Sequence, residues 1–104
     1  MRTMLKITMP VGAGAPTVKD GRIERVLGET ANRLHPEAAY FYPENGRRTA
    51  IMIFDLKNPA EIPAIVEPIF TELSGTAELH PVMNAEDLKQ GLATYLEQNA
   101  ALTH

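Results

Sequence analysis

Few residues in this sequence could do chemistry, and five of them fall where a β-strand would place its side chains on one face. Tyr40 and Tyr42 are two residues apart, as are Glu78 and His80, and Lys6 lies in an alternating run near the N-terminus. An imidazole can transfer a proton near neutral pH, and a carboxylate beside it can orient it or act as a base. We therefore take His80 and Glu78 as candidate catalytic residues. Lys6, Tyr40 and Tyr42 are candidate substrate-binding residues.

Residue types exclude several other kinds of site. The chain has no cysteine, which rules out disulfides, thiolate nucleophiles, iron–sulfur clusters and zinc–thiolate sites. Its three histidines (His35, His80 and His104) lie far apart without the spacing of metal ligands, so we expect no metal site. We expect no cofactor either, although haem ligation by His80 stays open, because no neighbouring residue decides it.

Length and charge narrow the class of protein. A chain of 104 residues makes one domain, here residues 1–104, and 44% hydrophobic with 22% charged residues is ordinary globular composition. A net charge of −3 disfavours nucleic acid, which needs a clustered basic surface. No apolar run approaches the ~20 residues that span a bilayer, and the N-terminus lacks a signal-peptide pattern. We expect a cytoplasmic protein with neither nucleic acid nor membrane as a partner.

The segment from Glu37 to Leu56 predicts a β-hairpin. Asn45-Gly46 is the dipeptide that most readily takes the two positive φ angles of a type I′ turn, and a two-residue loop fixes the register of its strands. Glu44 then faces Arg47, as a favourable charge pair beside the turn. Both faces of the second strand are apolar, so both faces of the sheet must be covered.

The remaining segments read as two strands and three helices. Strands are predicted over residues 3–9 and 76–83, where apolar side chains alternate. A first helix ends at Leu34, because the residue before a proline avoids the α region. A second helix follows an N-cap at Asn58, and a third starts at Asn84.

Details of the last two helices are also predicted. Pro68 should bend the second helix, and Ser74-Gly75 should end it. In the third, Asp87 follows Asn84 by three residues as a capping pair, and residues 99–104 should be frayed. The apolar stripe of this helix is Leu88, Leu92, Tyr95 and Leu96.

This order of elements predicts an α+β fold, a ferredoxin-like βαββαβ sandwich with an extra C-terminal helix. Right-handed crossovers place two helices on one face of a four-stranded antiparallel sheet with strand order 4-1-3-2. The row facing the helices is entirely apolar: Leu5, Ile7, Met9, Ala39, Phe41, Ala50, Met52, Phe54, Ala77 and Leu79. The open face would carry Met4, Lys6, Thr8, Tyr40, Tyr42, Thr49, Ile51, Ile53, Glu78, His80 and Val82.

The chain resembles the dimeric α+β barrel proteins over nearly its whole length. In that superfamily two ferredoxin-like protomers pack their open sheet faces together. The strings AAYFYPENGRR and TAELHPVM are also similar to a group of small bacterial proteins of unknown function with this fold. The resemblance implies a homodimer, but its members range from enzymes to stress proteins, so it leaves the chemistry open.

Two functions remain after these exclusions. In the first, the dimer binds or transforms a small organic molecule in the cavity over the open face, where Lys6 lies near Glu78 or His80. In the second, the interior is filled, Lys6 and Glu78 form an interface ion pair, and the protein is a structural or interaction module. Whether the chain is an enzyme is left undecided by its sequence.

Overall fold

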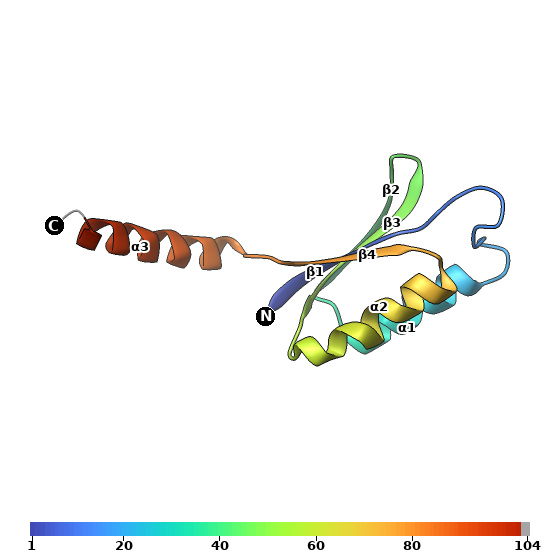
Figure 1. The fold of residues 1–104 in the computed structure, drawn as a ribbon, viewed down its shortest axis with the longest axis horizontal. Coiled ribbons are helices and arrows are strands. Elements are labelled where there is room, and N and C mark those ends of the chain that lie inside the picture. The colour runs from blue at the N-terminus through green and yellow to red at the C-terminus, as the bar shows by residue number, and fades with distance from the viewer. Residues whose placement is uncertain (103–104) are drawn as a thin grey trace.

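A four-stranded antiparallel sheet carries two helices on one face, while a third helix stands beyond the end of its strands (Figure 1). The computed structural model describes residues 1–102. In chain order the elements are β1 (Arg2–Thr8), α1 (Arg22–Leu34), β2 (Ala38–Glu44), β3 (Arg47–Asp55), a 3-10 turn (Pro59–Glu61), α2 (Ile62–Glu72), β4 (Thr76–Pro81) and α3 (Ala85–Leu102).

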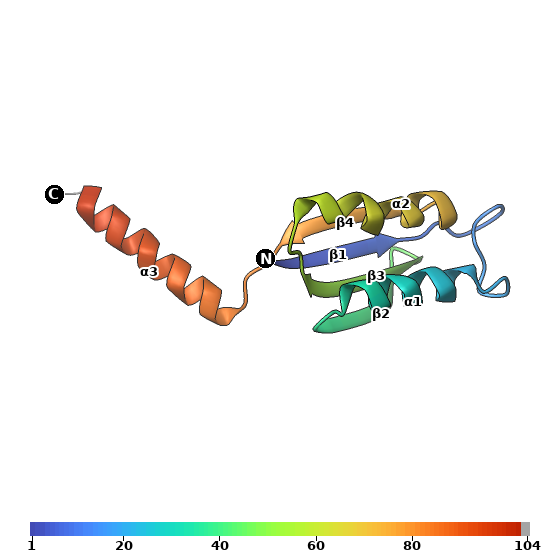
Figure 2. The ribbon, with the colours of Figure 1, turned by 90° about the horizontal axis from the view of Figure 1, so that it is seen from below.

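The sheet has the strand order β2-β3-β1-β4, which is the predicted order read from its other edge. Each neighbouring pair is antiparallel. Figure 2 shows α1 and α2 side by side on the same face of this sheet. The predicted α+β architecture with two helices on one face is therefore confirmed.

The β2–β3 hairpin has the predicted register and turn. Glu44 is opposite Arg47, and Tyr40 is opposite Ile51. Asn45 and Gly46 both have positive φ angles, 52° and 76°, which a type I′ turn requires at its two central positions. The turn therefore depends on a glycine that tolerates this backbone conformation.

Gly46→Val should lower the free energy of unfolding by roughly 1–3 kcal/mol, because a β-branched residue resists a positive φ angle. Urea denaturation of the two proteins measures the change. Gly28→Ala is the matched control: it lies within α1 with open space around its added Cβ, so it should stabilise slightly. An unchanged midpoint for Gly46→Val would contradict the turn assignment.

The core lies between the sheet and the two helices. Leu5, Ile7 and Phe54 from the strands pack with Ile69 of α2 and with Leu73, the residue that ends this helix, all at most 2% exposed. Two members of the predicted helix-facing row differ: Ala39 is exposed, and Phe41 is 61% exposed. They lie on β2, the edge strand, whereas α1 packs against the next strand inward, β3.

Helix α2 differs in detail from the single helix that the sequence predicts. Asn58 caps it as expected, since its side chain accepts a hydrogen bond from the Ala60 N–H at 2.9 Å, but a 3-10 turn precedes the α-helix. The left-handed residue at its end is Ser74, with φ 50°. Gly75 is needed for another reason: a Cβ there would lie 2.9 Å from the Thr8 carbonyl oxygen of β1.

Helix α3 extends the molecule to 64 Å along its longest axis, against 28 and 19 Å across (Figures 1 and 2). Its start is capped as predicted: the Asp87 N–H donates to Asn84 Oδ1 at 2.8 Å, and the Asn84 N–H donates to Asp87 Oδ2 at 3.1 Å. The helix includes residues 99–102, where the sequence predicts a frayed tail, while 103–104 lie outside the described residues. No helix within residues 1–102 has the length and apolar character needed to cross a membrane.

Candidate functional site

The strand register places all five candidate residues on the sheet face opposite α1 and α2. One row across the sheet reads Tyr40, Ile51, Lys6 and Glu78, from β2 through β3 and β1 to β4. His80 lies in the adjacent row, opposite Met4 of β1. Three strands therefore contribute the polar groups, and β3 contributes the apolar floor between them.

Lys6 forms an ion pair with Glu44 that the sequence did not predict. Its Nζ lies 2.6 Å from Glu44 Oε2, and the Tyr42 hydroxyl donates to Glu44 Oε1 at 3.1 Å. Lys6 is on β1 and Glu44 is on β2, so the pair spans the intervening strand β3. The residue of β3 midway between their register positions is Thr49, and it is only 2% exposed. The ion pair thus covers the polar end of the open face.

Sequence reasoning assigned Glu44 to Arg47 across the turn, and the structure instead pairs its side chain with Lys6. A signal for this pairing was present in the hairpin. Residues 40, 42 and 44 alternate onto the same face, so Glu44 belongs to the open face together with Tyr40 and Tyr42. A lysine side chain is long enough to reach diagonally across one strand to it.

Electrostatic effects fix the charge states of this cluster. The hydrogen bond from Lys6 lowers the pKa of the Glu44 carboxyl, and the hydrogen bond from Tyr42 lowers it further. The Lys6–Glu44 hydrogen bond also raises the pKa of the Lys6 ammonium. Partial desolvation, aided by the hydrogen bond to Glu44, raises the pKa of the Tyr42 phenol. At neutral pH the cluster therefore contains a carboxylate, an ammonium and a neutral phenol.

His80 and Glu78 form a second, looser pair at the β4 edge. His80 Nε2 lies 4.0 Å from Glu78 Oε1, and both side chains are 53% exposed. The separation suits an ion pair only when the imidazole is protonated, or a link through one water molecule. Tyr40, which is 66% exposed, lies at the opposite edge of the sheet.

The side-chain contacts divide the candidate residues within one chain. Lys6 and Tyr42 both contact Glu44, next to the β2–β3 turn. Glu78 is opposite Lys6 in the strand register but lies nearest to His80, and Tyr40 is at the far edge of the sheet. Within residues 1–102, no three His, Asp or Glu side chains are close enough together to hold a metal ion.

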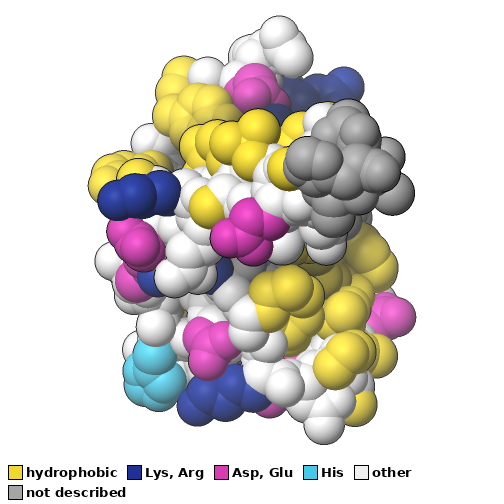
Figure 3. Space-filling view, turned by 90° about the vertical axis from the view of Figure 1, so that its left-hand side faces the viewer, with side chains coloured by type: hydrophobic (Ala, Val, Ile, Leu, Met, Phe, Trp, Pro, Cys, Tyr) yellow, Lys and Arg dark blue, Asp and Glu magenta, His cyan; other side chains and the backbone are white. Residues whose placement is uncertain are grey.

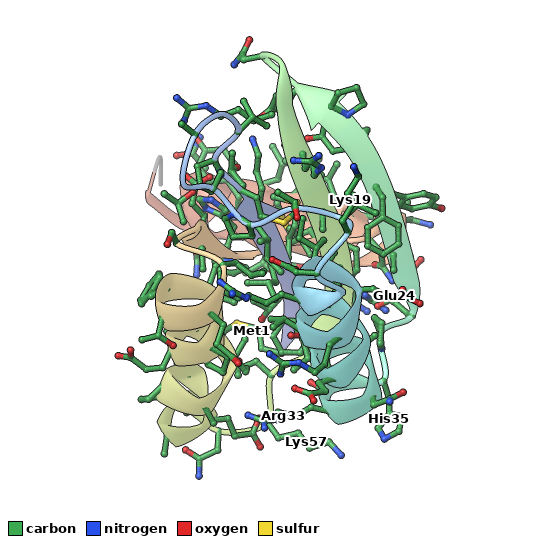
Figure 4. The ribbon with its side chains drawn as sticks, turned by 90° about the vertical axis from the view of Figure 1, so that its right-hand side faces the viewer. Met1, Lys19, Glu24, Arg33, His35 and Lys57 are labelled. Atoms are coloured by element: carbon green, nitrogen blue, oxygen red, sulfur yellow. The ribbon has the colours of Figure 1, made fainter. Side chains whose placement is uncertain are left out.

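Two hollows of about 680 and 670 Å³ lie away from these groups. Arg2, Glu37, Asp55, Val82 and Asp87 contribute to the first, at the end of the sheet next to α3. Residues at one end of the two core helices line the second (Figure 4), and its charges are mixed: Arg33, His35, Lys57, Asp55 and Glu61.

Comparison with protein-family models finds no match for this chain, and comparison with curated protein sequences finds none either. Among solved structures, the chain is similar to a formyltetrahydrofolate deformylase from Pseudomonas putida KT2440, with a TM-score of 0.50 and 16% sequence identity. The match covers 79% of this chain but only 29% of that enzyme. At this identity the likeness concerns the fold alone, and it agrees with the ferredoxin-like arrangement of strands and helices described above.

The ion pair of Glu44 predicts a loss of stability in acid. A carboxyl with a lowered folded-state pKa stabilises the fold above its usual value of 4.5, and this contribution disappears as the pH falls through the folded-state pKa. Glu44→Gln should therefore be less stable than wild type at pH 7, and the difference should shrink below pH 4.5. Urea midpoints across this range measure it.

Glu67→Gln, which removes an exposed carboxylate on α2, is the control for that experiment. Its midpoint should follow wild type across the same pH range. A constant difference between Glu44→Gln and wild type at every pH would show that the Lys6 pair does not contribute.

Proposed function

We propose that two copies of this chain pack their open sheet faces together as a dimeric α+β barrel whose interior binds a small organic molecule. The observation that carries this proposal is the composition of the open face. The Lys6–Glu44 ion pair lies beside half-buried Met4, Ile51 and Ile53. Apolar walls with a few converging polar groups are typical of small-molecule sites.

Packing two such faces satisfies the apolar side chains of β3. Alternate residues of this strand, among them Met52 and Phe54, are buried beneath the helices, whereas Ile51 and Ile53 point to the other side of the sheet and remain partly exposed. A twofold contact suits this surface, because each copy presents the same patch. Burial contributes about 25 cal/mol for each Å² of apolar area removed from water.

The polar groups indicate the chemistry of the ligand. An ammonium has three N–H donors, and one contact of Lys6 is taken by Glu44, so donors remain for a carboxylate or a carbonyl oxygen. Tyr40 has a phenol free to position such a group, and His80 with Glu78 could transfer a proton to or from it. We therefore propose a small anionic or carbonyl-bearing ligand.

A filled interior is the competing function, and one observation favours it. Lys6 and Tyr42 already pair with Glu44 within a single chain. If the facing sheet leaves no space above them, the protein is a structural or interaction module without catalysis. The volume enclosed between the two sheets distinguishes the two functions.

Ile53→Lys tests the assembly. Wild type should sediment as a dimer at micromolar concentration, and the variant should sediment as a monomer or aggregate, because a charge would enter an apolar interface. Val18→Lys is the control, since Val18 is 68% exposed in the loop before α1. A monomeric wild type would contradict the barrel.

Thermal unfolding in the presence of benzoate and phenylacetate tests ligand binding. These anionic probes should raise the Tm of wild type, and Lys6→Met and His80→Ala should reduce that increase. Lys19→Met, in the exposed loop before α1, is the control for losing a lysine away from the open face and from α3. If the interior is filled and the protein is a structural or interaction module, the probes should not raise the Tm of wild type, and His80→Ala should only lower the Tm.

A further inference from the structure

Helix α3 carries an apolar stripe that its own chain does not cover. Leu88, Leu92, Tyr95 and Leu96 recur at the spacing of one helix face, and they are 46%, 53%, 59% and 64% exposed. Every side chain of α3 from residue 85 to 100 is exposed. Large apolar side chains gathered in this way usually mark an interaction surface.

The direction in which α3 leaves the sheet is fixed by several contacts. The Val82 N–H donates to the Arg2 carbonyl at 3.1 Å, so the chain is still attached to β1 after β4 ends. Arg2 Nη1 then lies 3.2 Å from Asp87 Oδ2 in the first turn of α3, while Arg2 Nε holds Glu37 Oε1 at 2.6 Å. Folding α3 back over its own sheet would break these contacts.

Helices in proteins take most of their stability from tertiary packing of an amphipathic face. Gly91 in the middle of α3 costs about 1 kcal/mol relative to alanine. The stripe therefore requires a surface to pack on, which must come from outside the chain.

Charge and position favour a second copy of the chain as that surface. Glu86, Asp87 and Glu97 outnumber Lys89 on α3, whereas a helix that binds anionic membranes has a basic polar face. Figure 2 shows that α3 lies beyond the ends of the strands and runs obliquely to them, from the level of β2 to the level of β4. If the twofold axis between the two facing sheets runs along the strands, both α3 helices leave the dimer at the same end.

Part of the hydrophobic surface at the α3 end lies on the side that a facing copy would cover. Figure 3 looks onto this end and shows a band of hydrophobic side chains across the upper part of the surface and a second cluster at the lower right. In Figure 1 the upper side is the open face of the sheet, because α1 and α2 lie below it. A copy that faces the sheet therefore also faces this band.

We infer that the apolar stripe of α3 packs against α3 of a second copy, so that the crossed helices close one end of the barrel interior. This inference rests on the face-to-face dimer proposed above. The closed end adjoins the hollow of about 680 Å³ to which Arg2, Val82, Met83 and Asp87 contribute. The pair of helices would thus separate that end of the ligand cavity from solvent.

The areas involved support both contacts together. Four strands with an average length of about seven residues offer a flat face of roughly 19 by 23 Å, or about 440 Å². The stripe from Leu88 to Leu96 adds roughly 14 by 10 Å, or about 140 Å². The two surfaces together therefore come closer to the ~800 Å² per partner of a stable interface than either does alone.

Engineered cysteines test the helix contact directly, because the chain has none of its own. Leu92 lies near the middle of α3, where the two helices would cross. On mild oxidation Leu92→Cys should form a covalent dimer, whereas Gln90→Cys, on the opposite face of the helix, should remain largely uncrosslinked. Equal cross-linking of both variants would overturn the inference.

Lysine variants of the same two positions give an independent measurement. Leu92→Lys should raise the dissociation constant of the dimer by roughly tenfold to a hundredfold, and Gln90→Lys should leave it unchanged. Circular dichroism checks that both variants keep their helix content. An unchanged dissociation constant for Leu92→Lys would overturn the inference.

Comparing the Leu92 variants with Ile53→Lys distinguishes the contact between α3 helices from the contact between sheets. If Ile53→Lys is monomeric while the Leu92 variants match their controls, the sheets pair and α3 does not. If Leu92→Cys cross-links specifically while Ile53→Lys stays dimeric, the helices pair without the barrel. A monomeric wild type overturns both.

Discussion

The structure depends on one strand that is apolar on both faces. In β3, Ala50, Met52 and Phe54 are buried under the helices, while Ile51 and Ile53 face the other way. A strand with this pattern requires cover on both sides of its sheet. Helices α1 and α2 supply one cover, and they follow from two βαβ crossovers of the same hand. The other cover has to be provided by side chains that reach across the open face or by another chain.

The Lys6–Glu44 pair provides part of that second cover within the chain. It joins β1 to β2 over β3 and leaves Thr49 almost inaccessible to solvent. Both side chains are only partly exposed, so the pair contributes modestly to stability, and it brings an ammonium and a carboxylate together at the turn end of the open face. These charges give the open face a polar end that an anionic or carbonyl-bearing ligand could use. Packing and recognition would then depend on the same side chains.

Helix α3, like the open face of the sheet, carries apolar side chains that the chain itself leaves exposed. Its first turn is held by the Asn84–Asp87 cap and by Arg2, so its direction is set by the end of the sheet. Its stripe then repeats the situation of the open face, with apolar side chains on a rigid element and none of its own chain over them. A single twofold partner would cover both of these surfaces, which is why the two proposals belong together.

The sequence by itself determined the order of the elements, the hairpin register, the turn at Asn45-Gly46 and the caps at Asn58 and Asn84. These features are local, since they follow from side-chain alternation, backbone preferences and hydrogen bonds between near neighbours. Only the tertiary structure decided that Glu44 pairs with Lys6 rather than Arg47, that Phe41 stays exposed, and that Gly75 is needed for its approach to Thr8. Each of these depends on segments far apart in the chain, and their distances in space arise only when the strands and helices pack together.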